Sequence, residues 1–254
     1  MTPAKPLGMQ LYSGRKFPPV ASQLATIAHA GFTNVEPFGP FYDDIEATRG
    51  MLGVHGFSVF SGHFSLAMLE EETARAISAA KRLGIAIFVA PYLLPDRRPD
   101  TKAGWQAMGA RLSAIAATLG EVGLRFAWHN HDFKFRPLED GSLPIEHLLG
   151  EDLCWEADLA WVVRGGADPR KWLLHYRGRV PLVHVKDIAP LGANAEEDGW
   201  ADPGAGVLRS DELWPLCVAA GAEAMVAEHD NPSDFERFAR VSAAAMRACA
   251  GGDR

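Results

Sequence analysis

Short apolar runs of strand length alternate with longer segments of helical period along the whole chain. The runs at 8–13, 33–36, 57–63, 85–92, 124–130, 153–159, 180–186 and 223–228 predict strands. Each is followed by a predicted helix, at 20–30, 43–55, 70–83, 102–121, 144–149, 169–175, 211–220 and 233–250. Strict alternation predicts a parallel sheet, and eight strand–helix pairs can close into a barrel. An open doubly wound sheet is the alternative, but the phosphate loops GxGxxG and GxxxxGKS are absent from the sequence. We therefore expect an α/β fold with one (β/α)8 TIM-barrel domain over residues 1–254.

Composition narrows the class of protein. A chain of 254 residues that is 48% hydrophobic can bury one large core. Its net charge of −7 argues against a nucleic-acid-binding protein, because phosphate contacts need clustered Lys and Arg. Cys154, Cys217 and Cys249 form no CxxC pattern, so we expect reduced thiols. The sequence has neither a signal-peptide h-region nor an apolar run of membrane-spanning length, so we expect a cytoplasmic protein with no membrane partner.

The segment WHNHDFKF, at 128–135, concentrates ionisable groups at the end of the fifth predicted strand. It contains His129, His131 and Asp132. If the strand runs to Asn130, the alternation of side chains places both imidazoles on one face. Two such imidazoles suit a divalent metal or proton transfer. An isolated HxH is nevertheless more often a pair of hydrogen-bonded polar groups at a barrel rim.

Several other predicted strands also end in acids, imidazoles or an amine. A barrel enzyme has its active site where the carboxyl ends of the strands meet. The residues at these ends are Glu36, His63, Asp158, His184, Lys186, Glu228 and Asp230. Buried charges are costly unless they are paired or bind a metal. The set Asp158, His184 and Glu228, with His129 or His131 from the preceding strand, therefore predicts a site for Mn²⁺, Zn²⁺, Fe²⁺ or Co²⁺.

Six segments resemble the sugar phosphate isomerase/epimerase family of xylose isomerase-like TIM barrels. They are GMQLYSGR (8–15), GFTNVEPFG (31–39), AWHNHDFKF (127–135), EADLAWVVRGGADP (156–169), PLVHVKDI (181–188) and AEHDNP (227–232). The family includes inosose dehydratases, ketose 3-epimerases and endonuclease IV-type repair enzymes. The resemblance implies a divalent metal held by one residue from each of strands five to eight, usually Glu, Asp, His and Glu. Asp158, His184 and Glu228 match the last three.

The first ligand position departs from this pattern. It falls on His129, where the epimerases have Glu, so the chain resembles an HNH-bearing subgroup, and the fourth ligand is open between His129 and His131. An imidazole in place of a carboxylate makes the bound metal more Lewis acidic and favours Mn²⁺, Zn²⁺, Fe²⁺ or Co²⁺ over Mg²⁺. Two further departures are Trp161, where epimerases have a second His, and Lys134, where the subgroup pattern HNHDFEF has Glu.

The resemblance and the strand-end residues together predict a metal-dependent isomerase or epimerase, or a dehydratase or lyase. Its substrate would be a sugar, keto-sugar or cyclitol, converted through an enediolate formed when a base removes the proton alpha to a carbonyl. We assign the base to Glu228 or His131. We expect Lys186, Glu36 and His63 to bond substrate hydroxyls, Trp161 to line the pocket, and His129 to contact both metal and substrate.

Two rival functions use the same barrel. An endonuclease IV-type nuclease is disfavoured by the acidic charge, whereas a non-catalytic sugar-binding or partner subunit is consistent with Trp161 and Lys134. Relatives commonly self-associate, so a homo-oligomer remains an open expectation. The glycine-containing loop 202–206 follows strand seven, where barrels often bind phosphate, but a tight turn explains its glycines equally well.

Overall fold

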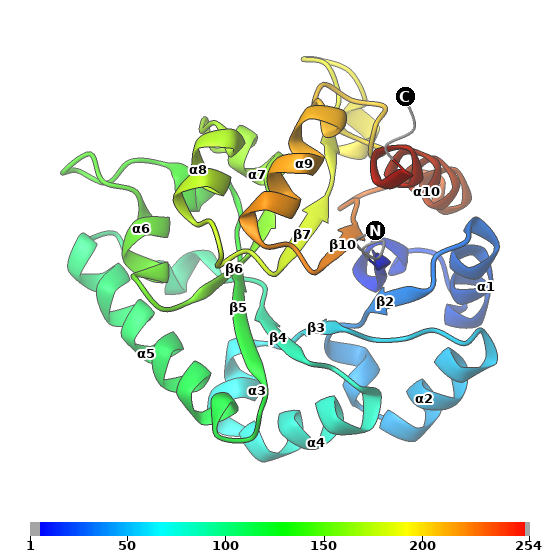
Figure 1. The fold of residues 1–254 in the computed structure, drawn as a ribbon, viewed down its shortest axis with the longest axis horizontal. Coiled ribbons are helices and arrows are strands. Elements are labelled where there is room, and N and C mark those ends of the chain that lie inside the picture. Colours follow the sequence, from blue (N-terminus) through cyan, green and yellow to red (C-terminus); the bar gives the residue numbers. More distant parts are fainter. Residues whose placement is uncertain (1–5, 252–254) are drawn as a thin grey trace.

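Eight parallel strands form a barrel in the computed structural model, which describes residues 6–251 (Figure 1). The strands are neighbours in the order β2-β1-β10-β7-β6-β5-β4-β3. Their bounds are β1 Leu7–Gln10, β2 Asn34–Glu36, β3 Ser61–His63, β4 Ile87–Ala90, β5 Arg125–His129, β6 Cys154–Asp158, β7 Leu182–Val185 and β10 Ala224–Ala227. The ring closes between β2 and β3, where Val35 N–H donates to the carbonyl of Ser58 at 3.0 Å and His63 N–H donates to that of Pro37 at 2.9 Å. The expected α/β barrel is therefore confirmed.

The helices surround the strands on the outside of the barrel (Figure 1). They are α1 Val20–Ala30, α2 Ile45–Val54, α3 Leu66–Glu71, α4 Thr73–Leu83, α5 Lys102–Gly120, α6 Pro144–Leu149, α7 Leu159–Arg164, α8 Pro169–His175, α9 Ser210–Ala220 and α10 Phe235–Gly251. Local signals explain many of their ends. Thr101 caps α5 by accepting the N–H of Gly104, and α1 ends at Gly31, whose φ of 90° suits a residue without Cβ. Among residues 6–251, no helix combines the length and apolar composition that crossing a membrane would require.

The first and third strands are shorter than the sequence predicts. Residues 11–14 form a 3-10 helix instead of continuing β1, because the side chain of Gln10 accepts the N–H of Tyr12 and turns the backbone. In the third unit, β3 covers only Ser61–His63, and Ser58 forms a single bridge to Asn34. Residues 57–60 therefore approach the barrel without lying in the strand.

Three helix and loop predictions also need correction. The expected helix 70–83 is divided between α3 and α4. The hydroxyl of Thr73 donates to the carbonyl of Leu69, and a new helix begins after Glu72. Helix α7 was not predicted, and it begins directly after its N-cap Asp158, whose side chain accepts the N–H of Trp161. The segment 187–208, predicted as a loop, contains the antiparallel pair β8 Asp187–Ile188 and β9 Trp200–Ala201.

The barrel has an apolar shell, an apolar floor and a polar upper interior. Large buried side chains such as Phe126 and Trp128 of β5 point outward to the helices. The inward positions nearer the strand starts form a small apolar cluster of Ile87, Val89, Ala127, Leu182 and Ala224. Further along the same strands, the buried inward residues become His, Glu and Asp. The floor thus supports a layer of charged groups at the carboxyl ends of the strands.

Candidate metal and substrate site

The four residues predicted to bind metal do converge in the folded chain. One ligand atom from each of His129, Asp158, His184 and Glu228 lies within 4.8 Å of the others, and all four are buried. We call this set the mouth group, because β5, β6 and β7 carry three of its members and Glu228 follows the last residue of β10. Asp158 Oδ2 has no hydrogen-bond partner among the described residues, and its charge is met by an ion pair with Lys186 Nζ at 3.5 Å. Imidazole and carboxylate donors fit the divalent metals that were expected.

The asparagine of the HNH segment locks β5 to β6 next to the mouth group. Asn130 Nδ2 donates to the carbonyl of Asp158 at 3.0 Å, and Asn130 Oδ1 accepts the N–H of Asp158 at 2.9 Å. The same oxygen accepts the indole N–H of Trp155 at 2.7 Å. The buried amide therefore fixes the backbone that carries a predicted ligand.

Lys186 neutralises the carboxylates of the mouth group. Its Nζ lies 3.2 Å from Glu228 Oε2 and 3.5 Å from Asp158 Oδ2, and it also bonds Asp230. Burial alone would lower the pKa of Lys186, but Asp230 and Glu228 outweigh it and raise the pKa. Burial raises the pKa of Asp158 to about 7, against the opposing effect of Lys186. Lys186 is therefore an internal ammonium and not a surface residue.

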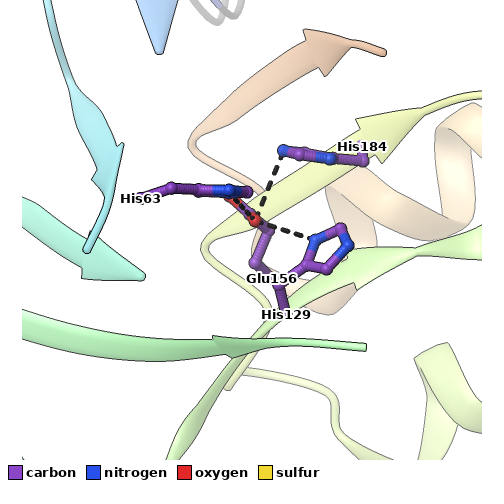
Figure 2. Close-up of side chains that lie close together, drawn as sticks. All are labelled: His63, His129, Glu156 and His184. Carbon is purple, nitrogen blue, oxygen red and sulfur yellow. Dashed lines mark hydrogen bonds and ion pairs between the residues drawn. The ribbon is translucent and has the colours of Figure 1, made fainter. Parts of the chain in front are cut away.

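A second cluster lies beside the mouth group and shares two of its histidines. We call His63, His129, Glu156 and His184 the inner group (Figure 2). Glu156 Oε2 is 2.8 Å from His63 Nε2, 3.0 Å from His129 Nδ1 and 3.3 Å from His184 Nε2. Sequence reasoning missed Glu156, although it lies two residues before Asp158 and strand alternation predicts that both point inward.

The imidazoles of the inner group have opposite electrostatic environments. Burial by itself would lower the pKa of His63, but Glu36 and Glu156 outweigh it and raise that pKa to about 10. The pKa of His184 is also raised, since Glu156 and Glu228 outweigh burial. Burial lowers the pKa of His129 to about 4, despite its hydrogen bond with Glu156. His129 is thus a neutral imidazole with an available lone pair, as a metal ligand requires.

Glu36 is more enclosed than its predicted role at substrate hydroxyls suggests. Its Oε2 accepts from Gln10 Nε2 at 2.7 Å and lies 2.8 Å from His184 Nε2, and Ser61 Oγ donates to its Oε1. Its exposed fraction is 0%, and that of His63 is 6%. Contact of Glu36 and His63 with a substrate stays a prediction, and the structure assigns their polar atoms to internal partners.

His131 and Trp161 lie together beyond the strand ends. Strand β5 ends at His129, so His131 lies outside the strand and precedes the 3-10 helix Asp132–Phe135, but the rings of the two histidines still lie 5.0 Å apart. The ring of His131 is 5.0 Å from that of Trp161 and 4.9 Å from that of Tyr92. His131 Nδ1 and Trp161 Nε1 are both buried, and the described part of the protein offers neither of them a hydrogen-bond partner.

Trp200 is a second aromatic residue near Lys186, and it was not among the residues predicted to line the site. It belongs to the unpredicted strand β9, and its ring lies 4.6 Å from that of Trp161. Lys186 Nζ is 4.3 Å from the centroid of Trp200, and the guanidinium carbon of Arg164 is 3.2 Å from it. The two indoles therefore cover the ammonium on the side of the β7–α9 segment.

The glycine-containing loop 202–206 donates backbone hydrogen bonds to the buried carboxylate of Asp187. Asp187 accepts backbone N–H groups from Gly204, Gly206 and Leu208 at 2.9–3.1 Å. A Cβ on Gly206 would lie 2.3 Å from Asp187 Oδ1, so only glycine allows this approach. The loop N–H groups are therefore used within the fold, which supports the tight-turn interpretation over phosphate binding.

Comparison with known proteins gives matches in structure alone. No protein-family model matches the sequence, and no curated protein matches it. A sugar phosphate isomerase/epimerase from Parabacteroides distasonis ATCC 8503 is 20% identical, with a TM-score of 0.79 over 97% of this chain and 95% of its own. The probable 3-DHS dehydratase AsbF from Bacillus anthracis is 12% identical, with a TM-score of 0.72 over 94% of this chain and 98% of its own.

A third match was solved with a metal ion. The IOLI protein with a binding zinc atom is 14% identical, with a TM-score of 0.71 over 96% of this chain and 98% of its own. At these identities the matches establish the fold. The protein therefore has the fold of the xylose isomerase-like TIM barrels, the architecture that its sequence segments predict.

Proposed function

We propose that this protein is a divalent-metal-dependent enzyme that isomerises, epimerises or dehydrates a sugar, keto-sugar or cyclitol. The observation that carries the proposal is the mouth group of two imidazoles and two carboxylates at the carboxyl ends of consecutive strands. Unpartnered polar atoms of His131 and Trp161 lie beyond it. The sugar isomerase/epimerase and dehydratase names of the structural matches support the same class of chemistry.

The mouth group supplies the ligands in this proposal. His129, Asp158, His184 and Glu228 would hold the metal, with Mn²⁺, Zn²⁺, Fe²⁺ or Co²⁺ preferred over Mg²⁺. The metal would supply Lewis acidity toward a substrate carbonyl and an adjacent hydroxyl. Lys186 holds the Asp158, Glu228 and Asp230 carboxylates in place.

His131 is the better candidate of the two predicted bases. Burial lowers the pKa of His131, so its imidazole is neutral near pH 7. In the tautomer protonated at Nε2, the unpartnered Nδ1 offers a lone pair to a substrate proton. Glu228, by contrast, already bonds His184 and Lys186 at 3.0 Å and 3.2 Å. We therefore assign removal of the proton alpha to the carbonyl to His131, and contact with a substrate oxygen to Trp161 Nε1.

Exchange of the alpha proton with solvent tests this proposal whatever the final product is. We would incubate the protein with Mn²⁺ and a panel of keto-sugars and cyclitol ketones in D₂O, and follow deuterium incorporation by NMR. We expect exchange that a chelator abolishes and Mn²⁺ restores. His131→Asn should lower the exchange rate by about 10²–10⁴-fold, the usual contribution of a general base.

The matched control is His175→Asn, which changes an exposed histidine at the end of α8 and should leave the rate unchanged. Exchange that is independent of metal would contradict the proposal. Sugar binding without exchange across the whole panel would favour the non-catalytic binding subunit.

A further inference from the structure

We propose that the inner group is a metal-binding position in its own right, and that in the substrate-free chain it takes up a divalent ion such as Zn²⁺ before the mouth group does. The position is formed by His63, His129, Glu156 and His184 (Figure 2). It is separate from the enzymatic activity proposed above, since a metal can be held there whether or not a sugar is converted.

The four side chains reach one point from four strands. His63 ends β3, His129 ends β5, Glu156 lies within β6 and His184 within β7. Their contacts to Glu156 Oε2 span 2.8–3.3 Å. Donor atoms around a metal with bonds of about 2.0–2.1 Å lie roughly 3 Å apart. The inner group therefore needs little rearrangement to surround an ion.

The donor set is that of a closed site. Three imidazoles and one carboxylate provide four protein ligands, the number found in tetrahedral zinc sites without an open position. All four residues are buried, with exposed fractions of 6% or less. Glu156 Oε1 has no hydrogen-bond partner among the described residues, so an unused carboxylate oxygen lies at the same place. A fully buried, half-satisfied carboxylate is costly unless a further group binds it.

The position of Lys186 makes metal binding less favourable at the mouth group than at the inner group. Its ammonium lies 3.2 Å from Glu228 Oε2 and 3.5 Å from Asp158 Oδ2, where it already balances the mouth carboxylates. A divalent ion bound to these oxygens would meet this ammonium at close range. Among the described residues, no Lys or Arg forms an ion pair with Glu156. Glu156 is therefore paired with imidazoles, which can themselves bind a metal, whereas the mouth carboxylates are paired with an ammonium, which cannot.

A second carboxylate adjoins the inner group. Glu36 Oε2 lies 3.1 Å from His63 Nε2 and 2.8 Å from His184 Nε2. Protons shared among Glu36, Glu156 and these imidazoles would produce similar distances without any metal. The experiment must therefore separate a metal site from a proton-bridged network.

The test uses the full chain with the mouth group disabled. In the Asp158→Asn, Glu228→Gln double variant we expect one equivalent of Co²⁺ to bind, as followed by its d–d absorption. Zn²⁺ X-ray absorption should show three imidazoles per metal. Adding Glu156→Gln should weaken Co²⁺ binding by more than about tenfold, because a ligand is at least as important as the residues that orient it. Glu139→Gln, at an exposed position, is the matched control and should leave the affinity unchanged.

The unmodified chain provides a second measurement in case the double variant does not fold, as judged by circular dichroism. Loaded with one equivalent of Zn²⁺ and no substrate, it should show three imidazoles. Two imidazoles, or Co²⁺ binding that the mouth variant loses and Glu156→Gln does not affect, would overturn the inference while leaving the proposed enzyme intact. Metal bound with three imidazoles but no exchange of the alpha proton would leave the inference standing and refute the proposed function. Failure of the unmodified chain to bind metal would refute both and identify a proton network.

Discussion

Two lysines are buried in this barrel, and the groups that surround their amines are of opposite kinds. Lys186, after β7, is surrounded by the carboxylates of Asp158, Glu228 and Asp230. Lys134, after β5, has no hydrogen-bond partner for its Nζ among the described residues. Its neighbours are aromatic, with centroids 3.7 Å away for Phe133, 4.5 Å for Trp128 and 5.2 Å for Trp105.

The pKa values of the two amines differ accordingly. Burial lowers the pKa of Lys134, and the nearby Arg98 adds to this effect. At Lys186 the same desolvation is outweighed by Asp230 and Glu228, so the pKa is raised. A buried cation is stable where acids are gathered for chemistry, whereas three aromatic faces do not replace a hydrogen-bond acceptor. Lys186 thus neutralises the carboxylates of the site, whereas the buried amine of Lys134 destabilises the folded state.

The largest expected effect is the loss of the Lys186 ammonium. Lys186→Met should lower the free energy of unfolding of the metal-free protein by about 3–5 kcal/mol at pH 7, because it leaves buried carboxylates without their cation. Urea denaturation in the presence of a chelator measures the change. Added Zn²⁺ should recover part of the loss, since a metal can replace the missing positive charge. A loss below about 1 kcal/mol would show that Lys186 does not balance the carboxylates.

The same substitution at the other lysine should act in the opposite direction. Lys134→Met keeps the apolar stem and removes an unsatisfied donor, so it should raise the free energy of unfolding by about 1–3 kcal/mol. Urea denaturation under the same conditions makes the two variants matched controls for each other. Destabilisation by Lys134→Met would mean that the aromatic rings stabilise Lys134 as an ammonium. The two lysines would then both stabilise the fold, contrary to the comparison above.

The third expected effect is a change with pH in the stabilisation that Lys134→Met produces. The unfolded chain protonates Lys134 below its ordinary pKa of 10.5, whereas in the folded chain the amine loses its proton at a lower pH. Between these two values the unfolded state binds more protons, so wild-type stability rises with pH. The advantage of Lys134→Met should therefore shrink from pH 7 to pH 9. An advantage that is constant or grows with pH would show that the pKa of Lys134 is not lowered.

The periodic parts of the fold were predictable and the local interruptions were not. Continuous apolar runs such as Ile87–Ala90, bounded by helical segments, predict buried parallel strands because both of their faces are covered. The early end of β1 could not be predicted in this way, since it depends on the side chain of Gln10 accepting a nearby N–H. Helix α7 was missed because Asp158 serves as its N-cap as well as a candidate ligand.

The candidate site was likewise predictable only in part. Asp158, His184 and Glu228 were identified because each lies within the last three residues of a predicted strand, and closure of the barrel brings such ends together. Glu156 was not predicted although it shares their inward face, because it lies two residues before Asp158, in the middle of β6. The end of β5 was predicted one residue too late, so His131 lies outside the strand, although its ring lies 5.0 Å from that of His129.

What the sequence by itself determined is the alternation of eight strand–helix pairs and the chemical type of the residues at their carboxyl ends. These follow from hydrophobic period and residue identity, which are local properties. Only the tertiary structure decided which charges meet. The pairing of Lys186 with three acids, the isolation of Lys134 among aromatic rings and the grouping of three histidines around Glu156 each join residues from different strands or turns. Such contacts depend on barrel closure and strand register, and no local pattern in the sequence specifies them.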